Sequence, residues 1–147
     1  MNSYAIDQNI IYDARRGKKL DKSPALNEKK FVYDFLPSEH KFLLNSTIKK
    51  KFTDMEKVVM KDTQYEDSMI VPMFMKLIFD GKRTEYATED PVPQELVKKC
   101  DNHYVAVTLD KNGILVSHDV KLKKKLMEYD ELKNCNCLEV SEALQTL

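Results

Sequence analysis

The chain has 147 residues, of which 42% are hydrophobic and 33% are charged, so it is long enough for one globular domain with a single core. Its 24 basic and 24 acidic side chains cancel at neutral pH, which excludes a protein that coats nucleic acid or membranes by net charge alone. The three cysteines form no even set typical of a secreted disulfide scaffold, and Asp7 interrupts any signal-peptide core, so we expect a cytoplasmic protein. The longest apolar run, Met69 to Phe79, contains Pro72 and Lys76 and is too short to span a bilayer.

The first half of the chain alternates short apolar runs, typical of buried strands, with stretches of helical spacing. We expect, in order, a strand over Ser3–Ile6, a helix over Gln8–Arg15, a helix from Pro24 or Asn27 to Leu36, a strand over Lys41–Leu44, and a helix capped by Ser46 or Thr47.

The second half continues the alternation with tighter spacing. We expect a helix over Tyr65–Phe79 kinked or begun at Pro72, a polar connection over Lys82–Pro93, a helix over Gln94–Leu109 broken near Cys100, a strand over Ile114–Val116, a helix over Lys121–Tyr129, a strand over Cys137–Val140, and a last helix capped by Ser141. Strands that alternate with helices predict one α/β domain over residues 1–147, with a parallel sheet covered by helices on both faces.

Acidic residues stand where predicted strands end. Asp7 follows the first strand, Asp119 follows the Ile114–Val116 strand, and Asp101 lies in the predicted helical segment that leads to that strand. In an open parallel sheet, ligands bind outside the carboxyl ends of the strands, so these carboxylates can face one cleft. Carboxylates that converge repel each other unless a cation neutralises them, and hard oxygen ligands suit Mg²⁺ or Mn²⁺.

Three separated stretches carry a resemblance to a known family. The N-terminal strand, Asp7 and Asn9 form an apolar strand followed by Asp-x-Asn. The stretch from Asp101 to Lys125 contains an Asp before an apolar helix, Gly113, a three-residue strand, and Ser117-His118-Asp119 before a leucine-bearing helix. The end of the chain from Val140 to Leu144 fits a closing strand and helix. These stretches resemble PIN-domain (VapC-like) ribonucleases, whereas residues 61–99 match only as generic helices.

The resemblance implies a three-layer α/β/α domain with a short parallel sheet and a Mg²⁺- or Mn²⁺-dependent endoribonuclease that cuts single-stranded RNA, of the toxin or RNA-processing type. Asp7, Asp101 and Asp119 would be catalytic metal ligands, and Asn9 and Ser117 would orient the site by hydrogen bonding. Members of this size are commonly homodimers, and many are the toxins of toxin–antitoxin pairs, so an antitoxin or another protein is an expected partner.

One position departs from the family pattern. The second acidic residue of the family falls at about Lys50 or Lys51 in this sequence, and the nearest carboxylates are those of Asp54 and Glu56, either of which is a possible substitute. If neither substitutes, a lysine ammonium occupies part of the metal site and weakens Mg²⁺ binding. The alternative function is therefore a catalytically impaired PIN-fold subunit that binds RNA or protein, and a third possibility is an unrelated α/β interaction domain.

Three further features have a functional and a structural interpretation. Lys121, Lys123 and Lys124, with Lys125, follow Asp119 and either hold RNA phosphates or form the solvated face of a helix. Met69, Met73 and Met75 either belong to the core or form an adaptable contact with a partner. His118 lies between Ser117 and Asp119, and either contacts substrate or is merely exposed.

Overall fold

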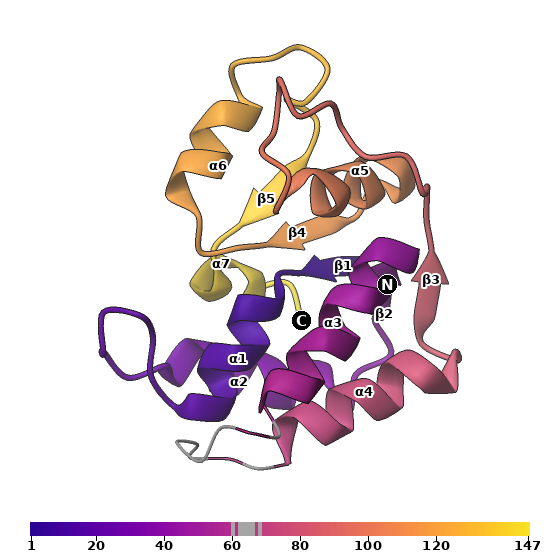
Figure 1. Cartoon of the computed structure of the whole chain (residues 1–147). Helices are drawn as coiled ribbons and strands as arrows, with labels where there is room; N and C mark the ends of the chain where they lie inside the picture. The colour runs from indigo at the N-terminus through magenta and orange to yellow at the C-terminus, as the bar shows by residue number, and fades with distance from the viewer. Residues whose placement is uncertain (60, 62–66, 68) are drawn as a thin grey trace.

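The computed structural model describes residues 1–59, 61, 67 and 69–147, and in these residues the chain forms an α/β domain with a five-stranded parallel sheet (Figure 1). The strand order is β3-β2-β1-β4-β5, and every neighbouring pair is parallel. The elements in chain order are β1 (Ser3–Ile6), α1 (Gln8–Arg16), α2 (Leu26–Phe35), β2 (Lys41–Leu44), α3 (Ser46–Val59), α4 (Ile70–Asp80), β3 (Thr84–Tyr86), α5 (Asn102–Lys111), β4 (Ile114–Val116), α6 (Val120–Leu126), β5 (Asn136–Leu138) and α7 (Val140–Leu144).

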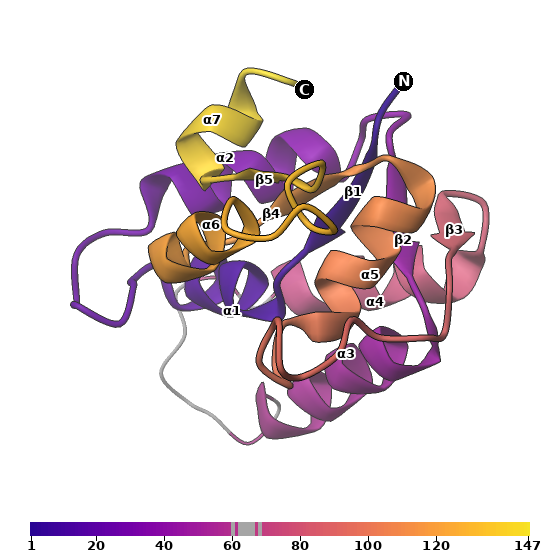
Figure 2. The same cartoon turned by 90° about the horizontal axis from the view of Figure 1, so that it is seen from above.

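Helices cover both faces of the sheet, which confirms the predicted α/β class with a short parallel sheet. Helix α5 packs against β1, β2 and β4, whereas α1, α2 and α4 lie on the opposite side of these strands (Figures 1 and 2). The central strands can therefore be apolar on both faces, and β4 is buried along its whole length. Among the described helices, none combines the length and apolar character needed to cross a bilayer.

A cluster of aromatic rings fills the layer on the α2 and α4 side of the sheet. The ring of Phe35 stacks on Phe31 and Phe74, and Phe42 of β2 contacts Phe35, Phe74 and Phe52 edge to face. Such pairs contribute stability beyond the area that they bury. The cluster fixes α2 and α4 against the strands, so the carboxyl ends of β1, β2 and β4 are held by a rigid scaffold.

Several helix ends differ from the predictions. Helix α1 runs to Arg16, one residue beyond the predicted Arg15, and Gly17 follows it in the left-handed region at φ 76°. The cap of α3 is Asn45, one residue before the predicted Ser46, because its Oδ1 accepts the Ile48 N–H at 2.9 Å. The predicted Ser141 cap is also wrong: α7 begins after Glu139, whose side chain forms a capping box with Glu142.

Two segments have a different secondary structure from the prediction. The polar connection over 82–93 contains the edge strand β3, and residues 94–101 form turns, so α5 begins only at Asn102. The predicted helix over 65–79 is observed as α4 from Ile70, with Pro72 in its first turn, and residues 65, 66 and 68 lie outside the described part. Met75 is buried in this helix, whereas Met69 and Met73 are exposed.

Candidate metal and phosphodiester site

The register of two neighbouring strands brings Asp7 close to the loop that carries Asp119. Strands β1 and β4 pair in parallel with Ile6 opposite Val116, so both chains leave the sheet at the same edge. The Asp7 N–H donates to the Val116 carbonyl at 3.1 Å, which extends the ladder by one residue. Asp119 follows three residues after Val116 and caps α6, accepting the Leu122 N–H at 3.1 Å.

Asp101 reaches the same edge from a helix. Helix α5 lies in the connection that leads to β4 and packs on the sheet, and a crossover helix between parallel strands runs back against them. Its first residues therefore lie at the carboxyl edge of the sheet, where Asp101 directly precedes it. Asp101 is buried, and its Oδ2 accepts no hydrogen bond from the described residues.

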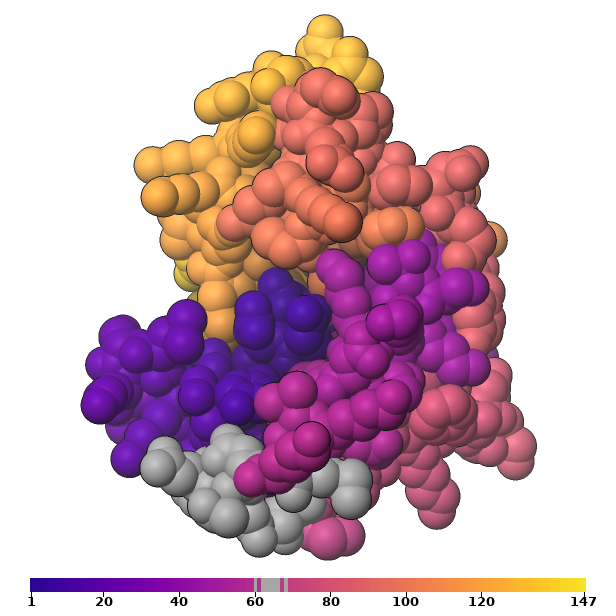
Figure 3. Space-filling model, in the orientation of Figure 1, coloured from indigo at the N-terminus to yellow at the C-terminus, as the bar shows by residue number. Residues whose placement is uncertain are grey.

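These three carboxylates line one cavity of about 210 Å³. The surface is hollowed between the start of α1, the segment before α5 and the loop after β4 (Figure 3). The full lining is Asp7, Gln8, Asn9, Lys98, Cys100, Asp101, His118 and Asp119. Three acidic side chains predicted from separated stretches of sequence thus share one cavity.

The carboxylates of Asp7 and Asp101 are held in an environment that disfavours their charge. Burial is the main cause that raises the pKa of Asp7, and the negative charge of Asp101 raises it further. Burial likewise raises the pKa of Asp101, against the opposing effect of the Lys98 ammonium, and the charge of Asp119 adds to the rise. A cation placed between these groups would relieve both effects.

Lysine 98 supplies part of that positive charge. Its Nζ lies 3.1 Å from Oδ2 of Asp119 and 3.7 Å from Oδ2 of Asp101, so one ammonium contacts two of the three carboxylates. Burial alone would raise the pKa of Asp119, but the hydrogen bond from Lys98 and the N–H of Leu122 outweigh it, and the pKa is lowered. The same ion pair raises the pKa of Lys98.

Lysine 51 lies at the edge of the site, at the position where the family pattern predicts an acidic residue. Its Nζ donates to the Cys100 carbonyl at 2.8 Å and lies 5.0 Å from the centre of the Tyr104 ring. Its charge lowers the pKa values of both Asp7 and Asp101 against the effect of burial. Lys51 therefore acts on two of the acidic residues through its charge, but it is not among the residues that line their cavity.

The two possible substitute acids are not part of the cavity. Asp54 accepts the Lys50 ammonium at 2.9 Å one turn back along α3, and about half of its side-chain surface is exposed. Neither Asp54 nor Glu56 is among the residues that line the cavity. The structure therefore brings together three of the five acidic residues considered from the sequence.

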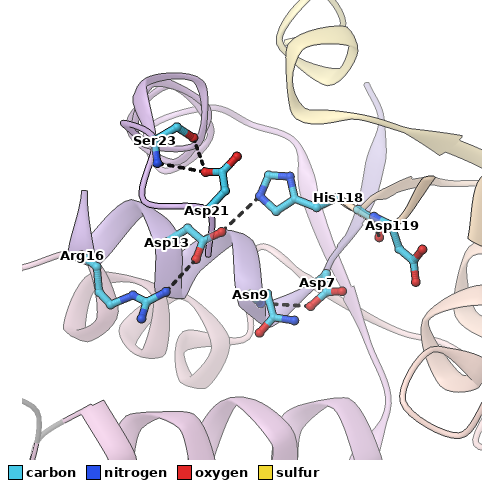
Figure 4. A network of polar contacts seen from close by, with 9 residues as sticks. Asp7, Asn9, Asp13, Arg16, Asp21, Ser23, His118 and Asp119 are labelled. Carbon is cyan, nitrogen blue, oxygen red and sulfur yellow. Dashed lines mark hydrogen bonds and ion pairs between the residues drawn. The ribbon is translucent and has the colours of Figure 1, made fainter. Parts of the chain in front are cut away.

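Asn9 and Ser117, the two residues predicted to orient the site, contact Asp7 and Asp119 respectively. The Asn9 backbone N–H donates to Oδ1 of Asp7 at 2.9 Å, and Figure 4 shows its side chain beside that carboxylate. Ser117 is buried, and its hydroxyl oxygen accepts the Asp119 N–H at 3.1 Å. Both contacts fix the backbone near an aspartate, but the Asn9 contact uses its backbone N–H and not its side chain, so the orienting role of both residues stays a prediction.

Sequence reasoning missed an ion pair behind the site. His118 Nε2 lies 3.4 Å from Oδ2 of Asp13, whose Oδ1 accepts the Arg16 guanidinium at 3.3 Å (Figure 4). The hydrogen bond that His118 donates to the Asp13 carboxylate is the largest cause that raises the pKa of His118. A signal was present in the sequence, since Asp13 shares the buried face of α1 with Ile10, three residues earlier.

The basic helix α6 begins at the cavity wall. Lys121 and Lys124 are exposed, whereas Lys123 is paired with Glu142 at 2.8 Å. The helix starts one residue after Asp119. Its lysines thus lie close in sequence to the cavity, but they are not among the residues that line it.

The carboxylate oxygens of the cavity are the kind of ligand that a hard divalent cation prefers, but in this structure they are not arranged as a coordination shell. Three carboxylates line the cavity, and the buried Oδ2 of Asp101 has no hydrogen bond from any described residue. Within residues 1–59, 61, 67 and 69–147, however, no group of three or more Asp, Glu, His or Cys side chains is arranged to hold a metal ion. A divalent cation would have to displace the Lys98 ammonium and draw the carboxylates together.

Comparison with known proteins adds no assignment to this geometry. No protein-family model matches the sequence. No curated protein matches it either. The five-stranded parallel sheet of order 3-2-1-4-5 is compatible with PIN-like folds.

Proposed function

We propose that this protein is a PIN-like, Mg²⁺- or Mn²⁺-dependent endoribonuclease that cleaves single-stranded RNA. The observation that carries the proposal is the convergence of Asp7, Asp101 and Asp119 on one cavity from two strand ends and a helix start. The strand order and the position of the cavity at the carboxyl edge of a parallel sheet support it.

Three groups of residues would have separate roles in RNA cleavage. Asp7, Asp101 and Asp119 would hold the cation, which when bound would stabilise charge on a phosphodiester and lower the pKa of a water molecule. Ser117 and the Asn9 N–H would keep Asp119 and Asp7 in position through the bonds described above. Lys121 and Lys124, which are exposed on the helix that follows Asp119, would attract the phosphates of the strand.

The test is Mn²⁺-dependent cleavage of an end-labelled single-stranded RNA by the wild type and by Asp101→Asn. Loss of a metal ligand should lower the cleavage rate by at least about a hundredfold. Asp130→Asn is the matched control, because it makes the same chemical change at a side chain that is 92% exposed and outside the cavity. Equal cleavage by the wild type and Asp101→Asn, or no cleavage by the wild type, would overturn the proposal.

A second function is favoured by a separate observation: two lysines compete for the acidic cavity. Lys98 pairs with Asp119 and Asp101, and Lys51 stands where the family pattern predicts an acidic residue. Two ammonium groups can neutralise the carboxylates without any metal, and the protein would then bind RNA without cutting it. RNA binding in EDTA together with absence of cleavage in millimolar Mn²⁺ would identify this second function.

A further inference from the structure

A second cavity of about 490 Å³ adjoins the acidic one. The two cavities share Gln8 and Cys100 in their walls, so they are adjacent. The lining of the second cavity is Gln8, Thr47, Lys51, Pro91, Gln94, Lys99, Cys100, Asn102 and His103. Its volume lies in the range of about 300–1,000 Å³ that is typical of small-molecule sites.

The charge of the second cavity is opposite to that of the first. Lys51 and Lys99 line it, and among the residues that the structure describes no carboxylate does. Glu89 is close enough to act on the pKa of His103, but its two carboxylate oxygens both accept the Ser46 N–H at 2.9 Å. An acidic cavity thus lies directly beside a basic one. A strand whose scissile phosphodiester is held in the acidic cavity by a bound cation would place a neighbouring phosphate near these lysines.

The other lining groups suit a nucleobase. The His103 imidazole is half-buried and is held by a hydrogen bond between its Nδ1 and the Asn45 amide at 2.9 Å, which fixes a flat ring at the wall. Unpaired RNA bases stack on such rings and are recognised by hydrogen bonds at their edges. Asn102 is buried, donates through Nδ2 to the Val92 carbonyl, and has an Oδ1 without a partner in the part of the chain that the structure describes.

We propose that this second cavity binds the nucleotide next to the scissile phosphodiester of single-stranded RNA. Lys51 and Lys99 hold its phosphate, and the base lies against His103. The assignment rests on the proposed function, since the acidic cavity has to be where the strand is cut. It also gives a role to Lys51: the lysine that departs from the family pattern contacts the substrate beside the acidic cavity.

The experiment measures binding without cleavage. Fluorescence anisotropy of a labelled oligouridylate is recorded in EDTA over a series of salt concentrations, for the wild type, Lys51→Gln and Lys99→Gln. Each variant should bind about three- to tenfold more weakly than the wild type. The plot of log association constant against log salt concentration should also become less steep, by about 0.7 for each lost phosphate contact. Lys133→Gln is the matched control, because Lys133 pairs with Asp130 and lines neither cavity.

A third variant, His103→Ala, tests the base contact and should weaken binding with little change in the salt slope. If both lysine variants bind like Lys133→Gln, or the wild type does not bind the probe, the inference is wrong. Binding with the predicted pattern but no Mn²⁺-dependent cleavage would keep this site and reject the nuclease. Cleavage by the wild type with unchanged KM in both lysine variants would keep the nuclease and reject this site.

Discussion

The ammonium nitrogen of Lys98 lies 3.1 Å from Oδ2 of Asp119, inside a cavity that Asp7 and Asp101 also line. The side chain of Lys98 is 62% exposed, so solvent weakens the pair, and it can leave the cavity at small cost. Lys98 is therefore a cation that a divalent metal has to displace.

Replacing Lys98 should strengthen metal binding. An exposed ion pair is worth up to about 1 kcal/mol, so Lys98→Gln should lower the Kd for Mn²⁺ by up to about fivefold. Titration calorimetry of the two proteins measures it, and Lys133→Gln, which removes a lysine outside the cavity, should leave the Kd unchanged. A weaker or unchanged Mn²⁺ affinity in Lys98→Gln would show that the ammonium does not compete with the metal.

The half-buried carboxylate of Asp7 should lower stability at neutral pH. Because burial raises its pKa in the folded protein, the folded state holds this proton more tightly than the unfolded state. Stability contributed by Asp7 is therefore present at low pH and is lost as the pH rises from the unfolded pKa through the folded pKa. At pH values above the folded-state pKa, the loss of stability caused by the charge of Asp7 stays constant.

The substitution that tests this is Asp7→Asn, because asparagine is as good a helix cap as aspartate. At pH 7 and without metal, the free energy of unfolding should rise by on the order of 1 kcal/mol, within the usual gain of a stabilising substitution. Urea denaturation at pH 7 and at pH 3 measures the effect, and the gain should disappear at the lower pH. A gain that is equal at both pH values would mean that charge is not its cause.

Gly113 should be intolerant of any side chain. A Cβ at this position would lie 2.6 Å from Cδ1 of Leu43 and 2.7 Å from the backbone oxygen of Ser3. Because that oxygen belongs to β1, Gly113→Ala should lower the free energy of unfolding by about 2 kcal/mol through overpacking. The control is Gly81→Ala, whose added Cβ would have no atom within 4 Å. The free energy of unfolding should fall there by about 1 kcal/mol, only because alanine disfavours a φ of 75°. Chemical denaturation should rank the two variants in that order, and the reverse order would contradict the close approach of β1.

The three thiols should differ in reactivity. Cys100 is exposed, although partial burial and the charge of Asp101 raise its pKa. Cys135 and Cys137 are buried, and burial raises the pKa of Cys135 to about 12 and that of Cys137 to about 11. Since the thiolate is the reactive form, a native protein treated with a thiol reagent at pH 8 should be modified at Cys100, and the other two should react only after unfolding. Cys100→Ser should abolish the native reaction. Rapid modification of that variant without denaturant would show that the β5 region opens.

The fold was largely predictable because apolar runs at strand and helix spacing dominate the central strands β1, β2 and β4. The edge strand β3 was not, since Thr84, Glu85 and Tyr86 carry no apolar run, and pairing with β2 alone makes them a strand. The start of α5 was placed too early for a similar reason, because residues 94–101 have helix-forming composition but are held in turns.

The acidic residues of the site could be selected from sequence because each follows a strand or precedes a helix at one edge of the sheet. The charged groups that pair with the site residues could not be predicted from sequence. Lys98 comes from a turn whose path depends on tertiary packing, and Asp13 pairs with His118 across 105 positions of sequence, which no local pattern specifies. The part of the site formed by long-range ion pairs became visible only in the structure.

The central claim is that Asp7, Asp101 and Asp119 together bind a divalent cation, and Mn²⁺ titration calorimetry on the wild type and Asp119→Asn tests it most directly. We predict that the wild type binds Mn²⁺ below millimolar concentration and that Asp119→Asn binds it at least about tenfold more weakly, because a charged ligand is lost. Absence of binding to the wild type at millimolar Mn²⁺, or equal binding by both proteins, would contradict it.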